Sequence, residues 1–230
     1  MKRSLLFSMA LTMVLSVTAC APAPTPAPTV VPTPTLSREA LQEAMFVAAR
    51  EDDNAAMQRY IAAGADVDKT NDMNITVLLV ASARGNVEMV DMLLDSGAAF
   101  DADDFCFAID NSKGNVAIVQ AFLDHGADVD AAENGIPEHT ALMYAAENGF
   151  IEIGELLLAK GADINKVDAF NDPAVNVAAF YGQLEFAKML VAHGADLNIA
   201  GQYGNTAVGQ ALRNGNTEVA DYLKSVGGTE

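Results

Sequence analysis

The sequence predicts an all-α repeat solenoid, in which short helix-turn-helix units stack in chain order. The clearest unit spans residues 140–165, TALMYAAENGFIEIGELLLAKGADIN. Apolar residues of its first half, such as Ala141 and Leu142, lie on one helical face. Gly149 then ends that helix, because glycine readily adopts the left-handed backbone of a helix C-terminus. A second apolar helix ends at Gly161. Neither helix is long enough to be stable alone in water, so the unit needs neighbours.

The same unit recurs along the chain. Glycines equivalent to Gly161 follow one another at spacings of 33, 29, 35, 33 and 33 residues, at Gly64, Gly97, Gly126, Gly194 and Gly227. Twelve residues before each lies a turn position, which is glycine in five units and Asp52 in the first. Aspartate also tolerates a left-handed backbone. A constant offset at a period near 33 residues indicates stacked repeats. The predicted units are residues 37–68, 69–101, 102–130, 131–165, 166–198 and 199–230.

Motifs inside these units resemble the ankyrin repeat, whose consensus contains Thr-Pro-Leu-His, a turn glycine and a Gly-Ala-Asp segment. Counterparts of the first motif occur in units four, five, six and two, at residues 140–143, 173–179, 206–208 and 76–78. The resemblance covers residues 36–228. It implies six ankyrin repeats with β-hairpin fingers between successive units. It also implies a protein partner on the concave side, against the fingers and the first helix of each unit.

Individual units depart from the pattern. Ser37 is expected to cap the first helix of the chain. In unit three only a short segment separates Gly97 from Phe105, so its finger is expected to be about four residues shorter. Asp110 and Asn111 align there with the alanines that stack in unit four. Because burial of an unpaired carboxylate is costly, Asp110 is expected to point outward or to have a partner. The fourth finger is two residues longer than the others.

The N-terminus differs from the rest of the chain. Residues 1–19 combine a short basic start with an apolar run and resemble a bacterial lipoprotein signal peptide. By this resemblance Cys20 is a lipid attachment site, and residues 20–36 form a proline-rich linker. The implied location is the cell envelope, on the periplasmic side of a membrane or the outer face of the cell membrane. An ordinary signal peptide with a chance cysteine is the alternative.

The charge is strongly acidic, with a formal net charge of −18. Loss of Lys2 and Arg3 with the signal peptide would leave −20. The absence of a basic stripe argues against nucleic acid, and against membrane binding other than through the lipid. The acidic charge serves solubility, or attracts a basic protein partner. We expect a monomer.

Residues with catalytic potential are few. His125 and His193 directly precede the unit-ending glycines, where a cation stabilises the end of a helix. Cys106 has no accompanying histidine or second cysteine in sequence, which favours a packing role. We expect no cofactor and no metal. The alternative is an enzyme or a metal-dependent envelope factor that uses Cys106 or acidic loops such as residues 101–104 and 128–130.

A binding surface is the main functional prediction. Apolar and aromatic side chains are frequent at finger positions and just before the turn glycines. The predicted partner-binding residues are Met73, Ile75, Ile136, His139, Phe170, Phe180, Tyr181, Gln202, Tyr203 and Asn205. The aromatic members should lie close together, with His139 exposed, although Phe170 or Phe180 could instead pack on its own repeat. An immunity-type inhibitor and a scaffold both fit this prediction. A purely structural role is a third possibility.

Overall fold

The computed structural model describes residues 37–135 and 137–230, so the predictions for Cys20, the linker and Ile136 lie outside it. In this part of the chain it contains twelve helices and no strand. The helices are α1 (Arg38–Glu51), α2 (Asn54–Ala62), α3 (Val77–Arg84), α4 (Val87–Asp95), α5 (Ala102–Asn111), α6 (Val116–Asp124), α7 (Ala141–Asn148), α8 (Ile151–Ala159), α9 (Ala174–Tyr181), α10 (Leu184–Ala192), α11 (Ala207–Arg213) and α12 (Thr217–Ser225). None of these helices has the length and apolar character needed to cross a membrane.

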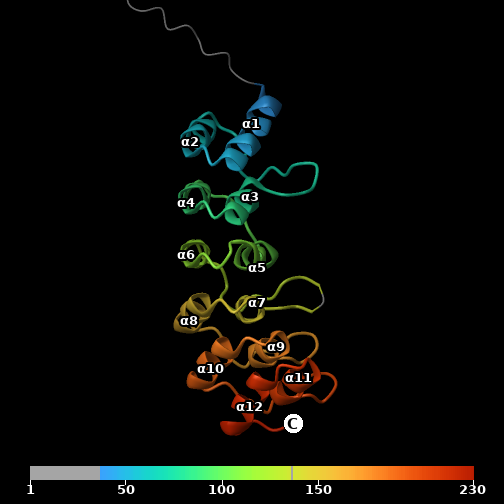
Figure 1. Cartoon of the computed structure of the whole chain (residues 1–230). Coiled ribbons are helices and arrows are strands. Elements are labelled where there is room, and N and C mark those ends of the chain that lie inside the picture. The colour runs from blue at the N-terminus through green and yellow to red at the C-terminus, as the bar shows by residue number, and fades with distance from the viewer. Residues whose placement is uncertain (1–36, 136) are drawn as a thin grey trace, which may run out of the picture. The chain divides into compact units, whose positions relative to one another are not determined.

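The helices form six consecutive pairs that stack in chain order (Figure 1). The first helices of the pairs form one row and the second helices form another, and each helix contacts its neighbours in its own row. Apolar side chains from both rows make one continuous core. Because all twelve helices contribute to it, Leu36–Glu230 is a compact unit by itself. We expect this part to fold without the residues that precede it.

The turn inside each pair has the predicted geometry. Asp52 has φ 57°, and the glycines at the equivalent positions of the other pairs have φ between 69° and 79°. Aspartate tolerates this backbone, and its carboxylate accepts a hydrogen bond of 2.8 Å from Arg84 of the next unit. This contact lowers the pKa of Asp52. Ser37 caps α1 as predicted, with its hydroxyl accepting from the Ala40 N–H.

The loops that join one pair to the next, which we call fingers, project from the row of first helices (Figure 1). They are not regular β-hairpins. In the described residues only two isolated antiparallel bridges occur, Ala132 with Thr140 and Val167 with Pro173. Side chains connect successive units instead. At four junctions a side-chain oxygen of one unit accepts a backbone N–H of the next: Asp68 from Ala99, Asp130 from Asp163, Asn165 from Asp196, and Asn198 from Thr229.

The third finger is almost absent. Six residues, 96–101, separate α4 from α5, whereas fourteen residues, 63–76, separate α2 from α3. The shortening is therefore about eight residues instead of the predicted four. The difference arises because α5 begins early, at Ala102, where Asp101 and Asp104 form a reciprocal capping box.

The early start also changes which residues of α5 stack. Ala108 and Ile109 are fully buried, whereas Asp110 is exposed. The prediction that Asp110 and Asn111 occupy the stacking positions is therefore wrong. Two extra residues before Gly114 shift the register of the helix relative to its turn. Asp110 both points outward and has a partner, since it accepts a hydrogen bond of 3.0 Å from Asn148 Nδ2.

Candidate protein-binding groove

A groove of about 460 Å³ lies where the fingers of units four to six meet α9 and α11. It is lined by Pro137, His139, Asp168, Phe170, Asp172, Asn176, Val177, Phe180, Tyr181, Tyr203, Gln210, Arg213 and Asn214. Five of the predicted partner-binding residues are among them. The structure thus brings together His139, Phe170, Phe180, Tyr181 and Tyr203 from three different units.

Aromatic side chains form the rim of this groove. Phe180 and Tyr181 end α9, directly before the turn at Gly182, and are 45% and 47% exposed. Their rings meet edge to face with centroids 5.0 Å apart. Tyr203, on the sixth finger, is 76% exposed. Phe170, on the fifth finger, is half-buried. A rim of exposed aromatic rings is typical of interaction sites, where such residues carry much of the binding energy.

The remaining predicted residues lie elsewhere. Met73, on the second finger, is 73% exposed, and Ile75 beside it is half-buried. Both belong to unit two and do not line the groove. Gln202 is exposed on the sixth finger, and its N–H donates to the Phe170 carbonyl. Asn205 is half-buried below it. Gln202 and Asn205 belong to the finger that carries Tyr203, but they do not line the groove.

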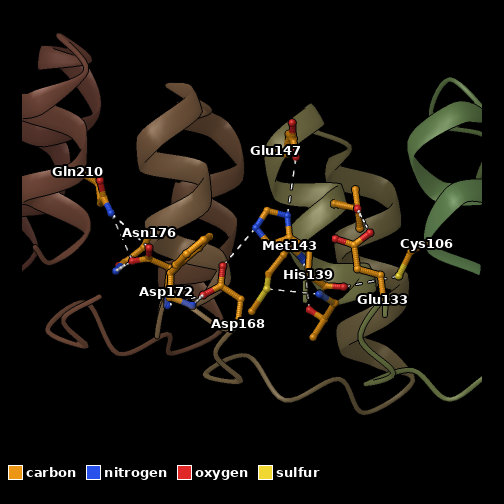
Figure 2. Close-up of polar contacts among 12 residues, drawn as sticks. Cys106, Glu133, His139, Met143, Glu147, Asp168, Asp172, Asn176 and Gln210 are labelled. Carbon is orange, nitrogen blue, oxygen red and sulfur yellow. Dashed lines mark hydrogen bonds and ion pairs between the residues drawn. The ribbon is translucent and has the colours of Figure 1, made fainter. Parts of the chain in front are cut away.

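The prediction that His139 is exposed is wrong. Its side chain is 12% exposed and lies between two carboxylates (Figure 2). The Nε2 atom is 3.3 Å from Asp168 Oδ2, and the Nδ1 atom is 3.9 Å from Glu147 Oε2. Its ring also packs edge-on against Tyr144, with centroids 5.5 Å apart. His139 therefore joins units four and five instead of facing a partner from the tip of a finger.

Asp168 organises the fifth finger. Its side chain is only 2% exposed. While Oδ2 pairs with His139, Oδ1 accepts the backbone N–H groups of Phe170, at 2.8 Å, and of Asp172, at 2.9 Å. A carboxylate with this many partners fixes the loop and therefore the position of Phe170.

Asp172 lies on the floor of the groove and is less completely paired. Its Oδ1 accepts from Asn176 Nδ2 at 2.8 Å, and Gln210 Nε2 is 3.4 Å from both of its oxygens (Figure 2). Burial raises the pKa of this carboxyl, and these neutral donors only partly offset the effect. Asn176, which is 1% exposed, was not predicted from the sequence. The sequence did offer a signal for Asn176, because a polar residue inside the apolar segment 174–181 needs a hydrogen-bond partner when it is buried.

Tyr181 is linked to the neighbouring unit. Burial, followed by a hydrogen bond with Glu147, raises the pKa of its phenol to about 12. The Tyr181 side chain therefore remains neutral at physiological pH. The Glu147 carboxylate thus contributes to the raised pKa of Tyr181 and lies 3.9 Å from His139 Nδ1.

Cys106 is a packing residue. It is 1% exposed, and its Sγ lies 3.7 Å from the His139 carbonyl oxygen. Burial, reinforced by the charge of Glu133, raises the pKa of its thiol to about 12. A nucleophilic cysteine needs a lowered pKa and access, and Cys106 has neither.

The aspartate side chains of the acidic loops accept hydrogen bonds from the backbone of the same loops. Asp66, Asp128, Asp163 and Asp196 each accept the N–H two residues further along the chain. Residues 37–135 and 137–230 contain no group of three or more histidine, cysteine, aspartate or glutamate side chains that could hold a metal ion. The alternative based on Cys106 or these loops therefore gains no support from the geometry.

The other two histidines have the predicted structural position. His125 follows α6 directly, with Nδ1 2.9 Å from the Ala121 carbonyl oxygen and Nε2 3.1 Å from Asp95 of the preceding unit. Both contacts raise the pKa of His125, the carbonyl contact more strongly. His193 follows α10 and reaches Glu155 at 2.8 Å. Each histidine thus connects two successive units.

Comparison with known proteins identifies the family of this chain. A family model described as ankyrin repeats (3 copies) matches residues 45–133, 105–168 and 142–229. The chain belongs to the ankyrin-repeat family. Ankyrin repeats are protein-binding modules, and the matched residues include the whole groove. No curated protein matches the sequence.

A solved structure from Bdellovibrio bacteriovorus resembles this ankyrin-repeat chain. It is described as the predatory endopeptidase Bd0816 in complex with the immunity protein Bd3460. The similarity has a TM-score of 0.68 and 26% sequence identity, and it covers 80% of this chain and 97% of the matched one. That complex is itself an assembly of two proteins.

Proposed function

We propose that this ankyrin-repeat chain is a non-catalytic inhibitor of the immunity type, which binds and blocks an enzyme acting on the cell envelope. The observation that carries the proposal is the groove, because its exposed aromatic rim gathers side chains from units five and six. A monomeric protein would have to keep these rings in water at a cost in free energy, whereas a partner would cover them.

The solved neighbour supports the nature of the partner. The immunity protein in that complex is bound to an endopeptidase. By similarity, an endopeptidase of the envelope is the partner class that we propose for this chain. The net charge of −20 without Lys2 and Arg3 favours a partner with a basic face, since opposite charges accelerate association. The chain acts as a monomer of six ankyrin repeats in this proposal.

The proposed anchor places the inhibitor where such an enzyme works. Cys20 carries the lipid, and the proline-rich linker sets the repeats away from the membrane surface. Two or more acyl chains hold a protein on a membrane durably. Cys20→Ser should move the protein from the membrane fraction to the soluble fraction and lower its mass by that of the acyl chains. A variant with unchanged mass and fractionation would show that Cys20 is not lipidated.

Capture and inhibition test the proposal together. The fragment of residues 37–230 is used to capture proteins from envelope extract, and the captured enzyme is assayed for endopeptidase activity with and without the fragment. We expect specific capture and inhibition. The triple variant Phe180→Ala, Tyr181→Ala and Tyr203→Ala should lose both, because each truncated ring removes exposed aromatic contact area.

The matched control removes three apolar side chains of moderate exposure outside the groove. Val47→Ala, Ile151→Ala and Val226→Ala change residues that are 41%, 38% and 42% exposed. This variant should capture as well as the wild type. Equal capture by the groove variant would place the partner elsewhere. Capture that leaves the enzyme fully active would favour a scaffold over an inhibitor.

A further inference from the structure

The rim of the groove is aromatic and its floor carries a carboxylate. Together they fit a ligand group that is both planar and positively charged. The rim consists of exposed aromatic rings, among them Tyr181 and Tyr203. The floor presents the half-buried carboxylate of Asp172. Aromatic faces attract cations, and a carboxylate accepts two parallel hydrogen bonds from a guanidinium.

Asp172 retains acceptor capacity that the described part of the chain does not use. Its contacts come from two neutral amides, Asn176 at 2.8 Å and Gln210 at 3.4 Å. An ionised carboxylate has about four lone-pair sites, so further hydrogen bonds can form. Burial raises the pKa of Asp172, and the two amides only partly lower it. Asp168, by contrast, accepts two backbone N–H groups at 2.8 and 2.9 Å and lies 3.3 Å from His139.

Among the described residues no cation forms a direct ion pair with Asp172, and the charge of His139 only partly lowers the pKa of this carboxyl. Arg213 also lines the groove, but it is exposed and takes part in no ion pair among residues 37–135 and 137–230. His139 is directed to Asp168 and Glu147 instead. The groove thus holds an aromatic rim and a half-buried carboxylate that has no direct ion-pair partner among the described residues.

We propose that the groove is a socket for an arginine side chain of the partner protein. The guanidinium donates hydrogen bonds to Asp172 and lies against the rings of Tyr181 and Tyr203. Arginine fits better than lysine because its planar group stacks on aromatic faces and forms two parallel bonds with one carboxylate. This inference rests on the proposed function, since it requires a protein partner, and it adds the chemistry of the central contact.

The test uses small probes, so it does not depend on capture of a partner. N-acetyl-arginine amide is titrated into the fragment of residues 37–230, and the amide chemical shifts of Asp172 and Tyr181 are followed by NMR. N-acetyl-citrulline amide is the neutral probe of the same shape. The arginine probe should bind roughly tenfold more tightly, as expected for hydrogen bonds between charged groups.

Two variants separate the charge from the rings. Asp172→Asn retains an acceptor oxygen for Asn176 and should abolish the preference for arginine over citrulline. Asp221→Asn, on the exposed side of α12, removes the same charge outside the groove and should leave the preference intact. Tyr203→Ala, at a residue that is 76% exposed, should weaken both probes while the protein stays folded.

Three results would overturn the socket: equal affinity for citrulline, tighter binding of N-acetyl-lysine amide, or an unchanged preference in Asp172→Asn. If these occur while the fragment still captures and inhibits an enzyme, only the arginine socket is refuted. If the probes behave as expected but no enzyme is captured, the guanidinium site stands and the proposed inhibitor role fails.

Discussion

Removal of the Asp168 carboxylate should destabilise the fifth finger strongly. Asp168→Ala leaves the partly buried N–H groups of Phe170 and Asp172 without an acceptor and His139 without its closest partner. Each unsatisfied buried group costs about 1–3 kcal/mol, and breaking a buried pair by removing one partner costs about 3–5 kcal/mol. Because the loop can partly relax into water, we expect a loss of about 3 kcal/mol in the free energy of unfolding, at the lower end of that range.

Urea unfolding followed by circular dichroism measures this loss, and hydrogen exchange at the Phe170 and Asp172 amides locates it. Asp168→Asn is the matched variant, since it keeps an oxygen for both N–H groups and removes only the charge. It should lose about 1 kcal/mol and retain protection of both amides. If Asp168→Ala costs less than about 0.5 kcal/mol, the size of an ordinary surface substitution, Asp168 does not organise the finger as described.

Three further predictions concern residues outside the groove. At Gly154 of α8, a Cβ atom would lie 2.6 Å from Met189 Cε and 2.7 Å from the ring of Phe186. Gly154→Ala should therefore lower stability by about 1–3 kcal/mol despite the better helix propensity of alanine, and an unchanged urea midpoint would contradict this packing. Iodoacetamide should modify Cys106 far more slowly in the folded protein than in urea, because burial raises the pKa of its thiol to about 12; equal rates, read by mass spectrometry, would contradict its burial. The pKa of His125 is raised by its carbonyl and carboxylate partners, so its protonated form stabilises the fold. That contribution should be complete below about pH 6.5 and lost as pH rises through the higher folded-state pKa, and His125→Gln should flatten the pH dependence of the urea midpoint there.

Several residues of the groove were predicted from the sequence. The aromatic residues before Gly182 and on the sixth finger were identified because the resemblance to the ankyrin repeat implies that those positions face a partner on the concave side. Met73 was recognised as exposed by the same reasoning, but it belongs to another unit. The aromatic members, which were expected to lie close together, line one groove, whereas Met73 does not.

The polar residues of the groove floor could not be predicted in the same way. The sequence places His139 on a finger and predicts that it is exposed. In the structure Asp168 of the fifth finger lies against it and buries it. Asn176 reads as an exception in an apolar helix, and its role depends on Asp172 of its own unit and on the Ile199 carbonyl of the next finger. Such networks form between units, so no single repeat encodes them.

The sequence by itself determined the repeated architecture, because each turn needs a residue that tolerates a left-handed backbone and each short helix needs apolar neighbours. The φ values of Asp52 and the turn glycines follow directly from this requirement. Only the tertiary structure decided the register of α5, since two extra residues before Gly114 place Ala108 and Ile109 in the stack instead of Asp110 and Asn111. It also decided that a buried ion pair and an incompletely paired carboxylate lie beneath the aromatic rim. The physical reason is that backbone geometry is local, whereas burial and charge compensation depend on neighbours supplied by other units.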